Sequence, residues 1–201
     1  MVTIQRGKFQ YIIISIFRIQ YMKNMCQHHS CQIFRRSNAS GVACILLNHH
    51  VKNGKSIGWV SLLGLEKHGR FKGSYNLCAG GIEKKDQGCY LRALMRELAE
   101  EFKIRISDFD AFDAIFKGNK GLRYIVHGGT PVFIGVVNNV KSAKLNALID
   151  RDNRDYNLPF AYKEMARVDW FRLDGKQRLK PPLPVSAFAT AVMLKVDPNK
   201  L

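Results

Sequence analysis

Residues 79–104 decide the fold of this chain, and they read AGGIEKKDQGCYLRALMRELAEEFKI. A pair of glycines opens the segment, a short polar loop follows, and the remainder has the pattern of an amphipathic helix. The apolar positions of that helix recur every three or four residues, at Leu91, Leu94, Leu98 and Phe102. We therefore expect a glycine turn that leads into a helix packed on the core by one face.

Three glutamates lie together on the same predicted helix. Glu97, Glu100 and Glu101 stand at positions i, i+3 and i+4, within about one third of the helix circumference and mostly opposite the apolar stripe. Carboxylates this close repel one another unless positive charge lies among them. A hard divalent cation, Mg²⁺ or Mn²⁺, would supply that charge because both prefer oxygen ligands. Arg92 and Arg96 border this face and would hold the carboxylates; the alternative interpretation is a solvent-facing acidic surface.

The order of these residues resembles a known signature. The run RELAEE at residues 96–101, preceded by Gly80 and Gly81, resembles the Nudix box of the Nudix hydrolases, G-x5-E-x7-R-E-U-x-E-E-x-G-U with U aliphatic. The R-E-U-x-E-E core is complete, and Ile104 fills the last aliphatic position. The resemblance implies an α/β (α+β) fold with a mixed β-sheet sandwiched between helices. It also implies divalent-metal-dependent hydrolysis of a diphosphate linkage in a nucleoside diphosphate linked to another moiety.

The loop before the helix departs from the signature. The pattern expects a glutamate at position 88, where this chain has Gly88. The opening glycine of the pattern falls at Ile82, so Gly81 fits only if the loop is one residue longer. Glu83 and Asp86 are the two candidates for supplying the missing carboxylate from this altered loop.

The end of the helix also departs from the signature. Lys103 replaces a glycine that ordinarily takes a left-handed conformation after the helix. A lysine there predicts either strain of about 1 kcal/mol or a different exit from the helix. Together with Gly88, this departure leaves open a catalytically silent Nudix fold that binds nucleotide or RNA.

The resemblance implies roles for particular residues. It implies a set of metal-ligating groups, the carboxylates of Glu97, Glu100 and Glu101 and a backbone carbonyl at Gly80 or Gly81. Arg96 would orient these ligands by hydrogen bonds. The general base varies across the family, and the candidates are Glu100, Glu101, Glu164, Asp150, Asp152 and Asp155.

The rest of the chain is predicted to form one domain, residues 39–201, after an extension at residues 1–38. Strands are predicted at residues 42–47, 57–65, 75–78, 122–127, 131–137 and 164–173. Residues 48–55, with His49 and His50, are predicted to be an exposed polar turn, and residues 67–73 a loop. Residues 106–117 are expected to pack phenylalanines on the sheet, and residues 185–196 to form a C-terminal helix. Residues 138–162 are polar and mixed in charge, which predicts a substrate-contacting loop with one helical turn near residues 143–149.

Charge and aromatic content indicate the kind of partner. The net charge is +16, from 32 Lys and Arg residues against 16 Asp and Glu, which favours a polyanion such as a nucleotide or RNA. Aromatic residues for base stacking are available at Trp59, Phe71, Tyr75, Tyr156 and Tyr162, although core packing is the alternative. A nucleotide or nucleotide conjugate is therefore the expected substrate, and hydrolysis of the mRNA 5′ cap (decapping) is the alternative within the same superfamily.

The extension at residues 1–38 and the cysteines bear on location. Residues 9–22 are apolar but interrupted by Arg18, and they are short for a membrane span, so no stable span is expected. A cluster of Cys and His at residues 26–31 lacks a standard zinc-ligand spacing. The five cysteines show no disulfide framework, which predicts a reducing, intracellular and cytoplasmic setting.

Overall fold

The computed structural model describes residues 39–52, 55–107, 109–119, 121–138, 140–173, 184–197 and 200. The predicted extension, with its apolar stretch and its Cys and His cluster, lies outside these residues. Of the helices in the described part of the chain, none is long and apolar enough to cross a membrane.

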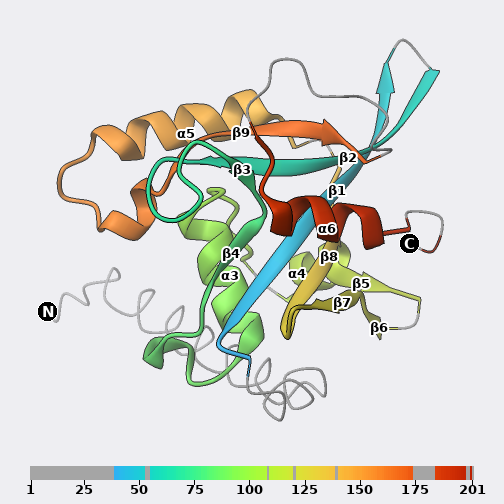
Figure 1. Cartoon of the computed structure of the whole chain (residues 1–201), viewed down its shortest axis with the longest axis horizontal. Coiled ribbons are helices and arrows are strands. Elements are labelled where there is room, and N and C mark those ends of the chain that lie inside the picture. Colours follow the sequence, from blue (N-terminus) through green and yellow to red (C-terminus); the bar gives the residue numbers. More distant parts are fainter. Residues whose placement is uncertain are drawn as a thin grey trace, which may run out of the picture.

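Seven strands of the described chain form one mixed sheet, in which β1 is central (Figure 1). The strands are β1 (Gly41–Lys52), β2 (Lys55–Glu66), β3 (Tyr75–Asn76), β4 (Cys78–Gly81), β7 (Tyr124–His127), β8 (Thr130–Val136) and β9 (Met165–Arg172). β1 runs antiparallel to β2 and β4 and parallel to β8, while β9 pairs with β2. β5 (Lys117–Gly118) and β6 (Gly121–Leu122) form a separate small ribbon.

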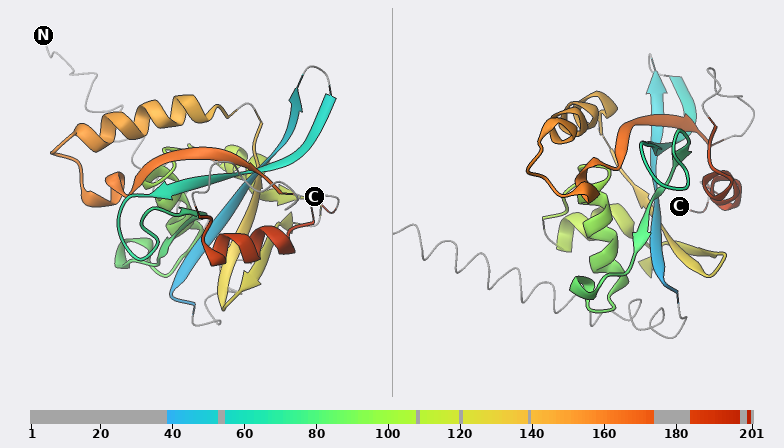
Figure 2. Two further views of the ribbon diagram at one scale, coloured as in Figure 1. Left: turned by 45° about the horizontal axis from the view of Figure 1, so that its top comes forward. Right: turned by 60° about the vertical axis from the view of Figure 1, so that its left-hand side comes forward.

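Helices cover both faces of the sheet. They are α3 (Tyr90–Glu100), α4 (Phe109–Phe116), α5 (Ser142–Arg154) and α6 (Ala187–Lys195), with short 3-10 turns η1 (Lys84–Asp86) and η2 (Phe160–Lys163). In the right-hand view of Figure 2, α3, α4 and α5 lie on one side of the sheet and α6 lies on the other. The predicted mixed sheet sandwiched between helices is confirmed.

The central strand builds a core on each side. Successive side chains of a strand point to opposite faces, so one set packs toward α3 and the other toward α6. Val42, Cys44 and Leu46 belong to the core that includes α3, α4 and α5. Ala43, Ile45 and Leu47 belong to the core that includes α6. Burial on both faces explains why residues 42–47 form an unbroken apolar run.

The predicted helix of the opening segment is confirmed as α3. Its apolar stripe is fully buried, at Leu91, Leu94, Leu98 and, just beyond the helix, Phe102. Burying each of these side chains stabilises the fold by roughly 1.5–3 kcal/mol. The stripe therefore sets which side of α3 faces the core and which side is left for the glutamates.

The predicted turn at residues 48–55 is wrong. β1 continues to Lys52 and β2 begins at Lys55, so His49 and His50 lie in a strand. His49 pairs across the ribbon with Trp59, their ring centroids being 5.4 Å apart. The residues are polar because this part of the ribbon extends beyond the core, and the predicted exposure of both histidines is confirmed.

The predicted loop at residues 138–162 is wrong in extent. The helical turn predicted near residues 143–149 is present, but it belongs to the 13-residue helix α5. Leu145 and Ile149, one turn apart, are buried against the rest of the fold. The side-chain amide of Asn146 makes two hydrogen bonds with the backbone of Val168. Its Nδ2 donates to the carbonyl oxygen at 3.0 Å, and its Oδ1 accepts from the N–H at 2.7 Å. The apolar stripe of this helix is narrow and lies between many charged residues, so the sequence pattern did not predict its full length.

Most other predicted elements are confirmed with shifted ends. β7 and β8 form the predicted hairpin, β9 follows Glu164, and α6 spans most of the predicted C-terminal helix. Phe112 and Phe116 of α4 are buried, as expected. The strand predicted at residues 75–78 is divided into β3 and β4.

Candidate active site

The C-terminal half of α3 lies against β4. The carboxylate of Glu97 contacts the backbone of Gly80 so closely that a Cβ atom at position 80 would be 1.9 Å from Glu97 Oε1. Glu101 Oε2 accepts a hydrogen bond of 3.0 Å from the N–H of Ala79. Glu97 and Glu100 of α3 and Glu101 directly after it, together called the α3 glutamates, are only 7%, 5% and 4% exposed, in that order. A solvent-facing acidic surface is therefore the wrong interpretation, and the predicted ligand residues do come together.

One guanidinium lies among these carboxylates. Arg96 Nη1 is 2.6 Å from Glu97 Oε1 and 2.9 Å from Glu100 Oε2, and its Nη2 donates to the carbonyl oxygen of Gly81 at 2.6 Å. Arg92 instead donates to Gln87. Of these two arginines, Arg96 has the contacts expected of a residue that orients the glutamates.

The altered loop supplies a carboxylate to the same guanidinium. Asp86, at the end of η1, is buried and accepts from Arg96 Nε at 3.2 Å and from Nη2 at 2.9 Å. Glu83, the other candidate, has Oε1 3.2 Å from Arg96 Nη1 but remains half-exposed. Both carboxylates contact Arg96, but Asp86 is the buried one and accepts two hydrogen bonds from the guanidinium.

Burial disfavours the charged form of two of these carboxylates, Glu97 and Glu101. Burial raises the pKa of Glu97 to about 7, although Arg96 lowers it. Burial, together with the charge of Glu97, raises the pKa of Glu101 well above its ordinary value. Burial alone would lower the pKa of Arg96, but the carboxylates around it raise that pKa, so the guanidinium stays charged. A site of this kind favours an additional cation.

Two acids from neighbouring strands complete the cluster. Glu164 directly precedes β9, and its backbone oxygen accepts from the N–H of Lys67 at 2.8 Å. Burial raises its pKa, and the charges of Glu66 and Glu100 raise it further. Glu66 ends β2 and accepts 2.7 Å from the side-chain amide of Asn76. Sequence reasoning missed Glu66, although it is the first acidic residue in the chain.

The other candidates for the general base are less suitable. Asp152 is held by Lys103 at 3.3 Å and by Arg151 at 2.8 Å. Burial would raise the pKa of Asp152, but these cations lower it overall, which makes the carboxylate a weak base. Asp150 and Asp155 are exposed on α5 and at its end.

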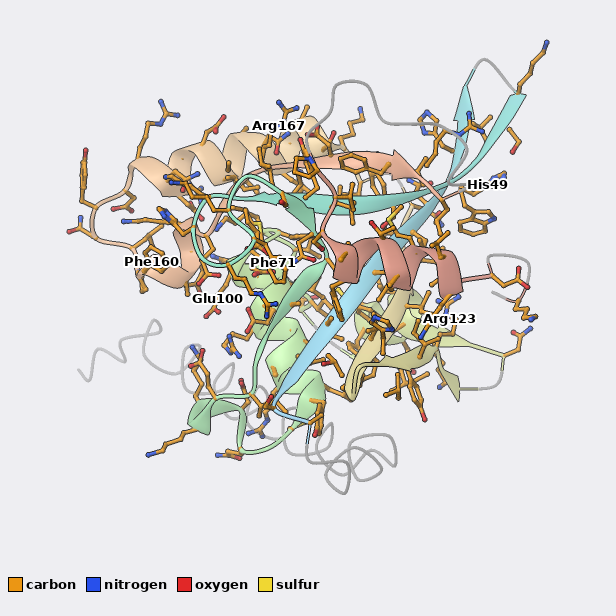
Figure 3. The ribbon with its side chains drawn as sticks, in the orientation of Figure 1. His49, Phe71, Glu100, Arg123, Phe160 and Arg167 are labelled. Atoms are coloured by element: carbon orange, nitrogen blue, oxygen red, sulfur yellow. The ribbon has the colours of Figure 1, made fainter. Side chains whose placement is uncertain are left out.

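The aromatic residues expected to stack on a base are dispersed. Tyr75 is buried and packs on Phe171, so for this residue the core interpretation holds. Trp59 lies on the β1–β2 ribbon, beside His49, which Figure 3 shows well to the right of Glu100. Tyr156, 96% exposed, follows α5.

Sequence reasoning missed another aromatic near Glu164. Phe160 of η2 is 59% exposed, and its ring centroid is 4.9 Å from that of His68 in the loop after β2. In the same loop, the guanidinium of Arg70 lies 5.6 Å from the ring centre of Phe71. No signal in the sequence set Phe160 and His68 apart, because their contact joins segments about ninety residues apart.

The donor groups suit a hard cation. Within the ranges that the structure describes, no group of three or more His, Cys, Asp or Glu side chains is arranged to hold a metal ion. Carboxylate oxygens of the α3 glutamates instead accept hydrogen bonds from Arg96 and from the N–H of Ala79. Carboxylate and carbonyl oxygens are nevertheless the ligands of Mg²⁺ and Mn²⁺, and the glycine backbone admits a carboxylate at contact distance. Metal binding by Glu97, Glu100, Glu101 and Gly80 stays a prediction.

Neither a protein-family model nor a curated protein matches the sequence. Solved structures do match. The NUDIX domain of Shewanella oneidensis NrtR, complexed with ADP ribose, is 12% identical over 76% of this chain and 82% of its own, with a TM-score of 0.42. A mutT/nudix family protein from Listeria innocua is 14% identical over 78% of this chain and 89% of its own, with a TM-score of 0.42. A MutT NUDIX hydrolase from Burkholderia pseudomallei is 15% identical over 77% of this chain and 98% of its own, with a TM-score of 0.36.

Proposed function

We propose that this chain is a Nudix-type pyrophosphohydrolase that depends on a divalent metal. Its reaction would be hydrolysis of a diphosphate linkage in a nucleoside diphosphate linked to another moiety. The observation that carries the proposal is the burial of Glu97, Glu100 and Glu101 at the end of α3, with Glu97 against the glycine backbone of β4 and one guanidinium beside Glu97 and Glu100. Buried carboxylates are costly unless cations compensate them, so such an arrangement suits a metal-binding site.

Glu97, Glu100 and Glu101, with the carbonyl oxygen of Gly80, would hold Mg²⁺ or Mn²⁺. When bound, such an ion polarises a phosphoryl oxygen and lowers the pKa of a bound water. Arg96 fixes the directions of two of these carboxylates through its hydrogen bonds, and Asp86 in turn fixes Arg96.

Glu164 is the general base that the geometry favours. Arg96 and Lys85 already contact Glu100, and Ala79 donates to Glu101. The pKa of Glu164 is raised by burial and by neighbouring carboxylates, which brings a carboxylate closer to the proton affinity that a base needs at neutral pH. In this role Glu164 takes the proton of the water that attacks phosphorus, while the bond from phosphorus to the bridging oxygen breaks.

The surroundings of Glu164 support a nucleotide as substrate. Phe160 and His68 are exposed neighbouring aromatic residues that suit contact with a base, and the loop at residues 67–73 carries exposed cations at Lys67, Arg70 and Lys72. Stacking of this kind contributes roughly 1–3 kcal/mol per base. The net charge of +16 keeps capped RNA as a second candidate substrate, whose binding would weaken steeply with salt.

The test is phosphate release from a panel of nucleoside-diphosphate conjugates and capped RNA, coupled to a phosphatase. Each substrate is assayed with Mg²⁺, with Mn²⁺ and with a chelator, for the wild type and for Glu101→Gln. We expect metal-dependent release by the wild type and a loss of several orders of magnitude in the variant. Metal-independent or undetectable release across the panel would contradict the proposal and favour a silent binding module.

A further inference from the structure

Lys103 has an unfavourable backbone conformation immediately after α3. Its φ is 59°, in the left-handed region that helices usually reserve for glycine at this position. The predicted strain is therefore present, and the helix exit is the one expected of the missing glycine. Strain of this kind persists where the surrounding structure holds the residue in place.

Contacts of the Lys103 side chain hold its backbone in this conformation. Only 5% of the side chain is exposed, and the ammonium group has three donors to satisfy. Nζ donates to the carbonyl oxygens of Glu100 and Tyr162, each at 2.6 Å, and lies 3.3 Å from Asp152 Oδ2. It also lies 5.2 Å from the centre of the Tyr162 ring. A glycine at this position would relieve the strain but make none of these contacts.

These contacts join three separate elements. Glu100 belongs to α3, Tyr162 to η2 and Asp152 to α5. Tyr162 precedes Glu164 by two residues, and from the other side Lys67 donates to the backbone oxygen of Glu164. The short segment that carries Glu164 is thus attached to the end of α3 through Lys103 and to the end of β2 through Lys67.

We infer that Lys103 is a positioning residue that sets the place of Glu164 relative to the glutamates of α3. This inference rests on the proposed function, in which Glu164 accepts the proton of the attacking water. A misplacement of about 1 Å at a reacting group can cost about 100-fold in rate. The lysine is accordingly retained in a strained conformation because it orders the base.

The experiment compares Lys103→Gly and Lys103→Met with the matched control Lys144→Met, which removes an exposed lysine from α5. In both Lys103 variants we expect kcat to fall about 10- to 100-fold while KM changes less than about threefold. Mn²⁺ affinity, followed by electron paramagnetic resonance, should be retained because no proposed ligand side chain is altered. Amide hydrogen exchange should increase at residues 160–165 but not at residues 91–98.

A double variant separates positioning from stability. Lys103→Met combined with Asp152→Asn removes both charges of the buried pair, so the thermal midpoint should recover relative to Lys103→Met, whereas kcat should stay low. Wild-type kcat or wild-type exchange at residues 160–165 in Lys103→Gly would overturn the positioning role alone. A wild-type protein without metal-dependent turnover would overturn the proposed function, and the positioning role with it.

Discussion

At the scale of single residues, the loop before α3 is shaped by two consecutive left-handed residues. Gln87 and Gly88 both have left-handed φ values, 53° and 68°, so the chain turns sharply after η1. That turn leaves Asp86 buried beside Arg96, where its two oxygens accept from the guanidinium. Asp86, two positions before Gly88, therefore brings a buried carboxylate to the guanidinium of Arg96.

Gly80→Ala tests how closely Glu97 must approach β4. The new Cβ would lie 1.9 Å from Glu97 Oε1, so the carboxylate must move, whereas in the control Gly81→Ala the nearest atom is the Ser40 oxygen at 3.8 Å. We expect Mn²⁺ affinity, measured by electron paramagnetic resonance, to fall at least about tenfold in Gly80→Ala only. Equal affinities in the two variants would rule out Glu97 and Gly80 as partners in one metal site.

The raised pKa of Glu97 makes stability depend on pH. A carboxyl group with a pKa of about 7 in the folded protein and 4.5 as its ordinary value binds more protons folded than unfolded between these pH values. The stabilisation of the fold by this group is therefore complete below pH 4.5 and is lost as pH rises through 7. In chelator, we expect the thermal midpoint to fall between about pH 5 and 8, and to fall less with Mg²⁺. A midpoint with the same pH dependence in both conditions would argue against cation binding at these carboxylates.

At the scale of elements, strand pairing brings the site together. β2 and β9 run antiparallel with Glu66 opposite Met165, so the end of one strand meets the start of the other. Glu66 and Glu164 are consequently neighbours although 98 positions separate them in the chain. α5 lies along β9 (Figure 1) and fixes it through Asn146, which makes this helix a support for the segment that carries Glu164.

Asn146→Ala should weaken that support. The substitution leaves both the N–H and the carbonyl group of Val168 without their side-chain partner, which typically costs about 1–3 kcal/mol. Urea unfolding should show this loss in the free energy of unfolding, while the control Asn138→Ala, at an exposed position, should stay within about 0.5 kcal/mol of wild type. Equal stability of the two variants would show that the Asn146 bridge contributes nothing.

At the scale of the whole molecule, one sheet separates two cores, and the candidate site lies on the side of α3 (Figure 2). The glutamates lie on the α3 side, η2 contacts the loop at residues 67–73 through Phe160 and His68, and α6 covers the other side of the sheet. This division means that changes in α6 should alter stability without changing the chemistry of the site.

Removal of residues 1–38 should leave the domain folded. Among the residues that the structure describes, the fully buried members of both cores lie between Val42 and Val196. A chain beginning at Ala39 also keeps the hydrogen bond from the Tyr90 hydroxyl to the Ala39 oxygen. We expect a cooperative thermal transition within a few degrees of the full-length protein. An insoluble product, or one without a transition, would show that the extension contributes to the core.

The sequence by itself determined the local features of this protein. Helical spacing predicted a buried Leu94 and clustered glutamates, and the position of Lys103 after the helix predicted either a strained backbone or a different helix exit. These features depend on neighbours within one or two turns. The tertiary structure alone decided that the glutamates are buried, that Glu66 and Glu164 join them, and that Lys103 contacts Tyr162. Those contacts depend on strand register and helix packing between segments far apart in the chain, which no local pattern encodes.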